Sequence, residues 1–379
     1  MISNSLRTPF IALCVNNQKQ LWPMKNIDQY YMQQALALAS RARITVSPNP
    51  MVGCIIVKDG AIISEGWHKF SGDSHAEINA LNSIGDAAKG STVYVTLEPC
   101  CHTGKTGPCT QSLIKAQVKK VIIATLDPNP QVSGRGVKLL EEAGIDVVVG
   151  ILEQQARDLN KIFMHYQCYK KPYVIAKWAM SLDGQTSVNT GDLKQISSLE
   201  SKTYTHQLRN MYDAIIIGKE TLINDNPSLD VRITVNHVLQ PIRFVVFSEI
   251  NKIDMKWKVL DQSVSKTIFV CTSISDIAKK NLDNIGVDVW LIKSYRNRVH
   301  LDTLIEKMGE YGITSLLVEG GRTLSSSFLE FKLVNEIVSY ISPSVIANSS
   351  RKLSVNYENV SNIGQDILVN AKPWVCKYV

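Results

Sequence analysis

Short apolar runs alternate with helical patterns along most of the sequence, and this alternation constrains the fold more than any other feature. In the first part of the chain, apolar runs typical of strands lie at 52–57, 92–97, 120–126 and 145–150. Apolar residues recur at helical spacing at 28–43, 75–84, 110–118 and 137–144. Lys-Asp-Gly at 58–60 predicts a tight turn, which makes 52–57 the first strand of a hairpin. Strands that alternate with helices form a mostly parallel sheet with helices on both faces.

The same alternation begins again near residue 170 and predicts a second α/β unit. Its strand patterns lie at 170–180, 213–218, 242–247, 267–271, 287–292, 314–318 and 336–341, and its helix patterns at 197–210, 274–282, 301–309 and 322–331. The helix at 197–210 is expected to begin with a serine as its N-cap. The chain has 379 residues. Because a domain has about 150 residues on average, two or three domains are expected. We place two domains at 26–150 and 172–379, with 151–171 as the linker.

Composition and charge exclude several classes of protein. Hydrophobic residues make up 45% and charged residues 20% of the chain, which is typical of a protein that buries a core and excludes general disorder. No apolar run reaches the roughly 18 residues that a membrane-spanning helix needs. The net charge of +7 suits a phosphorylated metabolite or a weak nucleic-acid contact and does not choose between them.

Eight cysteines occur in a chain that shows no secretory signal. Residues 9–15 are apolar, but the run is short and weakly flanked, so we expect no signal peptide. We therefore expect a cytoplasmic protein in which some cysteines bind a metal rather than pair as disulfides. Residues 1–25 show no sustained periodicity, and Met24 is an alternative start to Met1.

The strongest chemical signal is a set of metal-binding residue types at the ends of predicted elements. His75-Ala76-Glu77 opens a helix, Pro99-Cys100 follows a strand, and Cys109 comes before another helix. One imidazole and two thiolates bind zinc well and leave a fourth position for water. Zinc lowers the pKa of that water, and Glu77 is then placed to relay protons. This arrangement is the signature of zinc deaminases.

Two neighbouring residues compete with this choice of zinc ligands. Cys101 and His102 lie directly after Cys100 and are alternative ligands. We favour Cys100 because a residue directly after Pro99 is expected at a helix N-terminus, where the helix dipole favours a thiolate. Cys54 lies in an apolar strand and is expected in the core.

The cysteine spacing departs from the general deaminase signature and points to a particular family. Eight residues rather than two separate Cys100 from Cys109. Four segments, at 47–57, 73–81, 98–109 and 127–136, together resemble the deaminase domain of the bifunctional riboflavin-biosynthesis deaminase–reductases. The resemblance implies a cytidine-deaminase-like three-layer α/β/α domain. Its implied substrate is a 2,5-diamino-6-(ribosylamino)pyrimidinone 5′-phosphate.

The same resemblance implies which residues of the first half bind this substrate. Asn49 and His68 are expected beside the pyrimidine and ribose. Lys105, Asp127 and Asn129 are expected to face the sugar phosphate. Lys105 lies in a Gly-rich loop, where a lysine and exposed backbone amides suit a phosphate.

The second half resembles the reductase domain of the same family in four segments. These are 179–184, 206–232, 241–248 and 316–329. The resemblance implies a dihydrofolate-reductase-like α/β fold with NADPH as cofactor. It implies a substrate site made by Arg209, Leu229, Arg232 and Glu319, in which the two arginines meet the phosphate. The implied NADPH contacts are Ala179, Gln195, Thr221, Asp225, Ser248, Gly321, Arg322, Thr323, Leu324, Ser325, Ser326 and Ser327.

Several positions of the second half depart from the family pattern. Gln195 stands where the family has a tryptophan, Phe247 where it has an aspartate, and Asn335 where it has another aspartate. A stacking surface for the cofactor is therefore missing at Gln195. We expect a slower reductase that binds NADPH more weakly, and the alternative is a degenerate reductase beside an active deaminase.

Together the two halves predict a bifunctional enzyme of riboflavin synthesis, a hydrolase joined to an NADPH-dependent oxidoreductase. Its expected cofactors are Zn²⁺ and NADPH, and its expected partner is a small phosphorylated pyrimidine. We expect no nucleic-acid partner, no membrane contact and a homo-oligomeric state. One alternative is a nucleoside or nucleic-acid deaminase with an unrelated second domain, but 26–165 shows no basic stripe with interleaved aromatic residues. Another is a non-catalytic zinc protein, which needs a fourth ligand.

Overall fold

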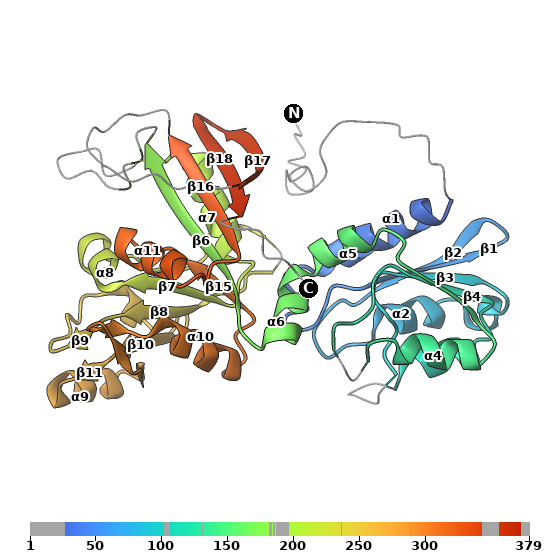
Figure 1. Cartoon of the computed structure of the whole chain (residues 1–379), viewed down its shortest axis with the longest axis horizontal. Coiled ribbons are helices and arrows are strands. Elements are labelled where there is room, and N and C mark those ends of the chain that lie inside the picture. The colour runs from blue at the N-terminus through green and yellow to red at the C-terminus, as the bar shows by residue number, and fades with distance from the viewer. Residues whose placement is uncertain are drawn as a thin grey trace, which may run out of the picture.

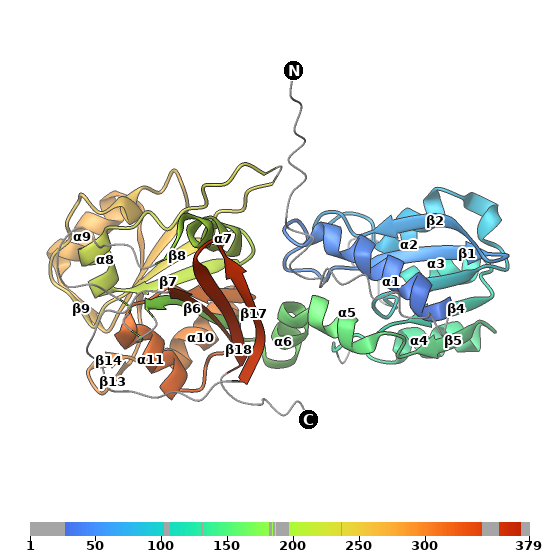
Figure 2. The ribbon, with the colours of Figure 1, turned by 90° about the horizontal axis from the view of Figure 1, so that it is seen from above.

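The computed structural model describes residues 27–101, 107–129, 132–181, 184, 186, 197–235, 237–342 and 356–372. Two α/β bodies lie side by side and are joined by a pair of short helices (Figures 1 and 2). Each body is built on its own sheet, so the two predicted α/β units are confirmed. Within the described residues, no helix has the length and apolar character needed to cross a membrane.

The first sheet has five strands in the order β2-β1-β3-β4-β5. Its strands are β1 (Gly53–Lys58), β2 (Ala61–Trp67), β3 (Thr92–Val95), β4 (Lys120–Ile123) and β5 (Asp146–Val149). The predicted hairpin is confirmed, because β1 and β2 pair antiparallel across Asp59 and Gly60. Both turn residues have positive φ angles, of 50° and 77°, as tight hairpin turns require.

The expectation of a mostly parallel sheet holds for the strand directions, because β2, β3, β4 and β5 all run the same way and β1 alone opposes them. β1 pairs antiparallel with both β2 and β3, and only the β3–β4 and β4–β5 pairings are parallel. The tight hairpin turn reverses the chain before the helical crossovers begin, and crossovers alone give parallel neighbours. Alternating strand and helix patterns do not reveal this reversal.

Helices cover both faces of the first sheet, as predicted (Figure 1). α1 (Ile27–Ala39) packs on one face against the side chains of Ile55 and Tyr94. α2 (Ala76–Asn82), α3 (Cys109–Lys115) and α4 (Arg135–Glu142) cover the other face. Gly66 allows α2 to lie directly on β2, because a Cβ at Gly66 would be 2.3 Å from the carbonyl oxygen of Ala76. This close approach sets the position of the first turn of α2, which carries Glu77.

The second sheet has nine strands in the order β12-β10-β8-β7-β15-β6-β16-β18-β17. They are β6 (Tyr173–Ser181), β7 (Ala214–Gly218), β8 (Ile242–Val246), β10 (Thr267–Cys271), β12 (Asp288–Leu291), β15 (Ser315–Val318), β16 (Glu336–Ser342), β17 (Asn356–Ile363) and β18 (Asp366–Lys372). The pairings from β12 to β16 are parallel. The β17–β18 hairpin, which was not predicted, joins the β16 edge antiparallel.

Helices again cover both faces of this sheet. α7 (Leu199–Arg209), α8 (Lys219–Asp225) and α9 (Asp276–Asn284) lie on one face, and α10 (Leu301–Glu310) and α11 (Arg322–Glu330) on the other. A hydrophobic core lies on each face of the sheet, and the side chains of successive β7 residues pack alternately into the two. Ile215 and Ile217 lie on the α7 side, and Ile216 lies on the α10 side. A strand that is buried on both faces in this way has a continuous run of apolar residues in its sequence. Ser198 caps α7 by accepting a hydrogen bond from the Ser201 backbone N–H at 3.2 Å, as predicted.

The segment expected as a linker, 151–171, contains two helices that were not predicted. They are α5 (Glu153–Leu159) and α6 (Lys161–Tyr169). α5 packs on the α1 side of the first sheet through Ala156. α6 lies between the two bodies in both views (Figures 1 and 2).

Candidate active sites

Three predicted zinc ligands converge in the first half. His75 is the residue that caps the N-terminus of α2, and Cys109 begins α3. Cys100 lies between β3 and α3, so the expectation that it lies at a helix N-terminus is wrong, and Cys109 has that place instead. The Nδ1 atom of His75 is 3.2 Å from the sulfur of Cys109 and 3.5 Å from the sulfur of Cys100. Cys101, the alternative ligand, is not part of this cluster, whose three ligand atoms all lie within 4.8 Å of one another. The other alternative, His102, lies outside the described residues.

These residues fit a zinc ion. Bonds of about 2.1 Å to nitrogen and 2.3 Å to sulfur in a tetrahedron place neighbouring ligand atoms roughly 3.5 Å apart, which agrees with the spacing here. A hydrogen bond from the Cys109 thiol, together with His75, lowers the pKa of Cys100 despite its burial. A thiolate at Cys100 is the form that binds zinc.

Glu77 lies in the first turn of α2 beside this cluster, as predicted. Its side chain is buried, with 3% of its surface exposed. Burial raises the pKa of Glu77 to about 7, and a hydrogen bond with the Cys109 thiol opposes part of this rise. A carboxyl group with a pKa near neutrality both accepts and donates protons readily, which is what a proton relay requires.

The two residues expected beside the pyrimidine contact each other. The amide Nδ2 of Asn49 is 3.2 Å from Nε2 of His68, and Nδ1 of His68 is 3.1 Å from the carbonyl oxygen of Ser74. Since a carbonyl oxygen only accepts, Nδ1 of His68 carries the proton and Nε2 accepts from Asn49. Burial lowers the pKa of His68, which favours this neutral form. The His68 ring lies 5.4 Å from the His75 ring, so the pair borders the metal cluster.

Glu98, which the sequence analysis did not single out, shapes the loop that carries Asp127 and Asn129. Its buried carboxylate accepts hydrogen bonds from the backbone N–H groups of Asp127, Gly134, Gly136 and Val137, at 2.9 to 3.3 Å. Asp127 in turn accepts from the Asn129 N–H at 2.8 Å. Lys105, the third residue expected at the phosphate, lies outside the described residues.

In the second half, two of the predicted substrate residues form one ion pair. Arg209 donates from Nε and NH2 to the two carboxylate oxygens of Glu319, at 2.7 and 2.9 Å. Burial alone would raise the pKa of Glu319, but Arg209 and Lys177 outweigh it and lower that pKa to about 2. Lys177, which was not predicted, lies on β6 with its Nζ 3.8 Å from Glu319. Only its position in the sheet, and no sequence motif, brings it to this site.

The loop from Pro227 to Arg232 brings the other predicted substrate residues to the same place. The carbonyl oxygen of Asp230 accepts from NH1 of Arg209 at 3.1 Å, and its carboxylate pairs with Arg232 at 3.0 Å. Leu229 is buried with a φ of 55°, a backbone conformation that branched residues rarely adopt and that often marks a binding loop. His206, another residue not predicted, lies 3.5 Å from NH2 of Arg232.

Residues expected to bind NADPH gather at the carboxyl ends of the strands. The Thr221 hydroxyl accepts from the Gly321 N–H at 3.0 Å, which joins the start of α8 to the start of α11. α11 follows β15 through Glu319, Gly320 and Gly321, and a Cβ at Gly321 would be 3.2 Å from the Thr221 hydroxyl. Backbone amides at the start of a helix after glycines fit a cofactor phosphate. The described residues of this group at the start of α11 are Gly321, Arg322, Thr323, Leu324, Ser325, Ser326 and Ser327.

The remaining NADPH residues are spread over three elements. Ala179 lies on β6, Asp225 ends α8, and Ser248 follows β8. Gln195 lies outside the described residues. The side chain of Phe247, which stands where the family has an aspartate, points into the core, where its ring stacks on Phe269 at 5.2 Å.

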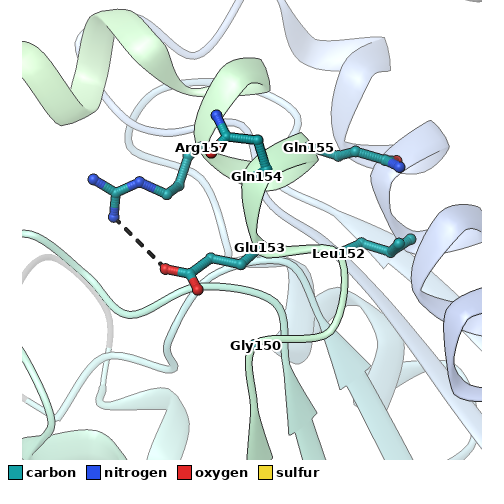
Figure 3. Close-up of a pocket in the computed structure, with 6 residues that line it drawn as sticks. All are labelled: Gly150, Leu152, Glu153, Gln154, Gln155 and Arg157. Carbon is teal, nitrogen blue, oxygen red and sulfur yellow. Dashed lines mark ion pairs between the residues drawn. The ribbon is translucent and has the colours of Figure 1, made fainter. Parts of the chain in front are cut away.

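A surface hollow at the start of α5 is lined by none of the residues predicted for either site. Its lining residues are Gly150, Leu152, Glu153, Gln154, Gln155 and Arg157 (Figure 3). Glu153 and Arg157 form an ion pair of 3.9 Å across one turn of α5. The metal cluster lies elsewhere, at the starts of α2 and α3.

Comparisons with known proteins cover both halves of the chain. The model of the RibD C-terminal domain matches residues 172–372, and that of the cytidine and deoxycytidylate deaminase zinc-binding region matches residues 25–125. A riboflavin biosynthesis protein RibD from Aquifex aeolicus is 38% identical over 91% of this chain and 98% of its own length. The chain belongs to the RibD family. A RibD structure from Acinetobacter baumannii superposes with a TM-score of 0.82 at 36% identity, covering 92% of this chain and 99% of that one.

A second RibD-like structure carries both activities in its name. The Thermotoga maritima diaminohydroxyphosphoribosylaminopyrimidine deaminase/5-amino-6-(5-phosphoribosylamino)uracil reductase has a TM-score of 0.79 and 31% identity, over 92% of this chain and 99% of its own. The chain is therefore a bifunctional riboflavin biosynthesis enzyme with a zinc-dependent deaminase half and an NADPH-dependent reductase half. The RibD match over the second half excludes the alternative of an unrelated second domain.

Proposed function

We propose that the first half deaminates a 2,5-diamino-6-(ribosylamino)pyrimidin-4-one 5′-phosphate and that the second half reduces the ribosyl side chain of its product. The observation that carries the first step is the convergence of His75, Cys100 and Cys109 beside the buried carboxyl group of Glu77. The observation that carries the second is the Arg209–Glu319 ion pair, which joins the end of α7 to the residue that follows β15.

In the first step, the 2-amino group of the pyrimidine is replaced by the oxygen of a water molecule, and ammonia leaves. Zinc held by His75, Cys100 and Cys109 supplies the activation of that water. Glu77 takes a proton from the water and delivers it to the departing amine, because its buried carboxyl group lies beside the three zinc ligands. No proton carrier besides Glu77 is needed for this exchange.

The substrate is oriented by the side chains that border the metal cluster. Asn49 and His68 form a rigid pair, since the ring of His68 is held by both Asn49 and Ser74. We place the pyrimidine and ribose against this pair. The sugar phosphate lies toward Asp127, Asn129 and Lys105, where Glu98 fixes the backbone of the loop.

In the second step, NADPH held by the residues at the starts of α8 and α11 would supply a hydride to C1′ of the ribose. The bond from C1′ to the ring oxygen breaks, and that oxygen takes a proton, which leaves an open ribityl chain. Arg232 is the more accessible cation for the substrate phosphate, because 62% of its side chain is exposed. Arg209 is bound to Glu319 and to the carbonyl oxygen of Asp230, so it contacts the phosphate only by sharing these bonds. The side chain of Leu229 packs in the hydrophobic core, so we place its backbone rather than its side chain beside the substrate.

The order of the two steps is tested by following the products by mass with the whole chain. The diaminopyrimidine phosphate alone is expected to give only the deaminated product, and NADPH is expected to convert that product further with loss of absorbance at 340 nm. Reduction in the absence of the deaminated product contradicts the order. No oxidation of saturating NADPH with a folded chain contradicts the second step.

A tryptophan at position 195 is expected to strengthen NADPH binding. The glutamine there removes a stacking surface worth up to about 1.5 kcal/mol. Gln195→Trp should therefore lower the KM for NADPH by about tenfold, since 1.4 kcal/mol is a factor of ten. Initial rates at 340 nm measure this, and an unchanged KM shows that residue 195 does not touch the cofactor.

The proposal also includes the partner, the cellular compartment and the oligomeric state of the enzyme. A small phosphorylated pyrimidine is the partner of both halves, and the cytoplasm is where NADPH and reduced cysteines are maintained. We also propose that the chain forms a homo-oligomer. Light scattering of the purified chain tests this, and a mass of one chain at working concentration contradicts it.

A further inference from the structure

Asn160, which lies between α5 and α6, is bound to the loop that carries Asn49. Its Oδ1 accepts a hydrogen bond from the Met51 N–H at 2.8 Å, and its Nδ2 donates to the Met51 carbonyl oxygen at 2.9 Å. Only 2% of Asn160 is exposed. One side chain therefore satisfies both backbone groups of Met51, two residues after Asn49.

The same loop is held at its other end by the reductase half. The Ser47 hydroxyl donates to Asp213 at 2.9 Å, and Asp213 also accepts from the Thr314 N–H at 2.8 Å at the base of the second sheet. Within the loop, the Asn49 N–H donates to the carbonyl oxygen of Val46 at 2.7 Å. The loop is thus held on both sides of Asn49, through the Ser47 side chain on one side and the Met51 backbone on the other, by groups that lie outside the first sheet.

The helix that begins after Asn160 is attached to the reductase half. Lys161 forms an ion pair with Glu336 of β16. The Tyr166 hydroxyl donates to the carbonyl oxygen of Gly309 at 2.9 Å. Figures 1 and 2 show α6 between the two bodies, with α5 leading back to the first. Asn160 therefore lies where the deaminase loop meets a helix anchored in the other half.

We propose that Asn160 is a positioning residue of the deaminase site, which holds the Asn49 loop in the geometry that binds substrate. It lies outside the stretch 25–125 that matches the deaminase zinc-binding region. Its action is indirect: the amide fixes Met51, Met51 fixes the direction of the loop, and the loop aims Asn49 at Nε2 of His68. This inference rests on the proposed contact between Asn49 and the substrate.

Asn160→Leu in the full chain tests the inference, because leucine has a similar volume and forms neither hydrogen bond. The expected result is a rise of about tenfold in the KM of deamination with a much smaller change in kcat, because without both bonds to Met51 the Asn49 loop spends less time in the geometry that binds substrate. Zinc content and the rate of NADPH oxidation on the deaminated product are expected to stay unchanged. A merely structural role would lower kcat, zinc content or folded yield instead.

Two further variants keep the test decisive. Asn160→Asp retains the acceptor for the Met51 N–H and loses the donor, so it should also raise the KM, and it replaces the leucine variant if that one does not fold. Tyr166→Phe removes a bond between α6 and the reductase half without touching Met51, so it should leave the KM unchanged. An equal rise in Tyr166→Phe would assign the effect to the docking of α6 and overturn the role of the Asn160 amide.

Asn49→Ala separates failure of this inference from failure of the proposed function. If Asn49→Ala raises the KM and the Asn160 variants do not, the inference is overturned and the substrate contact of Asn49 stands. If Asn49→Ala leaves the KM unchanged, the proposed contact itself is wrong, and the role of Asn160 falls with it.

Discussion

Replacing Glu77 with glutamine is expected to lower the kcat of deamination by at least about 100-fold, the usual size of a general acid–base contribution. Glutamine keeps the shape of the side chain but neither accepts nor releases a proton at neutral pH. Glu77 is buried beside the cluster but supplies none of its three ligand atoms. The Glu77→Gln variant should therefore keep its zinc and its substrate binding. Ammonia release and metal analysis on the same sample measure both.

Glu65→Gln is a matched control for this change, because Glu65 lies exposed on β2 of the same half. It removes the same charge and should leave deamination unchanged. Near-normal turnover of Glu77→Gln with zinc bound would mean that another group moves the proton. Loss of zinc from that variant would show instead that Glu77 supports the metal ligands.

The elements that the sequence predicted are those fixed by local chemistry. The Asp59-Gly60 turn, the Ser198 cap and the buried strand at β7 each depend on residues within a few positions of one another. Local propensity and burial favour the same structure there, so the pattern is reliable. The motif spacing likewise predicted that His75, Cys100 and Cys109 meet, and the structure brings them together.

The elements that the sequence analysis missed depend on distant parts of the chain. α5 and α6 have seven and nine residues, and helices this short are marginal without tertiary packing. The β17–β18 hairpin is completed by the edge of β16. α5 and β17 are also mostly polar (EQQARDL and NYENVSNI), so their sequences give no clear apolar pattern.

The site residues that the sequence analysis missed also reach their sites through contacts between distant parts of the chain. Lys177 follows no motif, but parallel pairing of β6 with β15 places it near the end of the strand that precedes Glu319. Glu98 directly precedes Pro99-Cys100 and was given no role of its own in the sequence analysis. Its carboxylate nevertheless accepts hydrogen bonds from four backbone N–H groups that lie more than 25 residues away along the chain. Buried carboxylates need such partners, but a sequence does not show which backbone groups provide them.

Cys100→Ser and Cys109→Ser are each expected to remove zinc and with it the deaminase activity, by about 1,000-fold or more. Serine is a poor zinc ligand because its hydroxyl stays protonated at neutral pH, so either variant leaves two protein ligands where catalytic sites use three. Without the metal, the pKa of the attacking water rises from about 7 toward its value of about 15.7 in bulk solution. Metal analysis should find about one zinc per chain in the parent and almost none in the variants.

Cys101→Ser is the matched control, because Cys101 is the next residue and lies outside the three-membered cluster. It should keep both zinc and deaminase activity. NADPH oxidation by the second half serves as a check of folding in all three variants, since its sheet and core are separate from the metal cluster. Zinc retained in both Cys100→Ser and Cys109→Ser would exclude this site. Loss of zinc in Cys101→Ser would instead show that the loop between Cys100 and Cys109 rearranges around the ion, with Cys101 as a ligand in place of one of them.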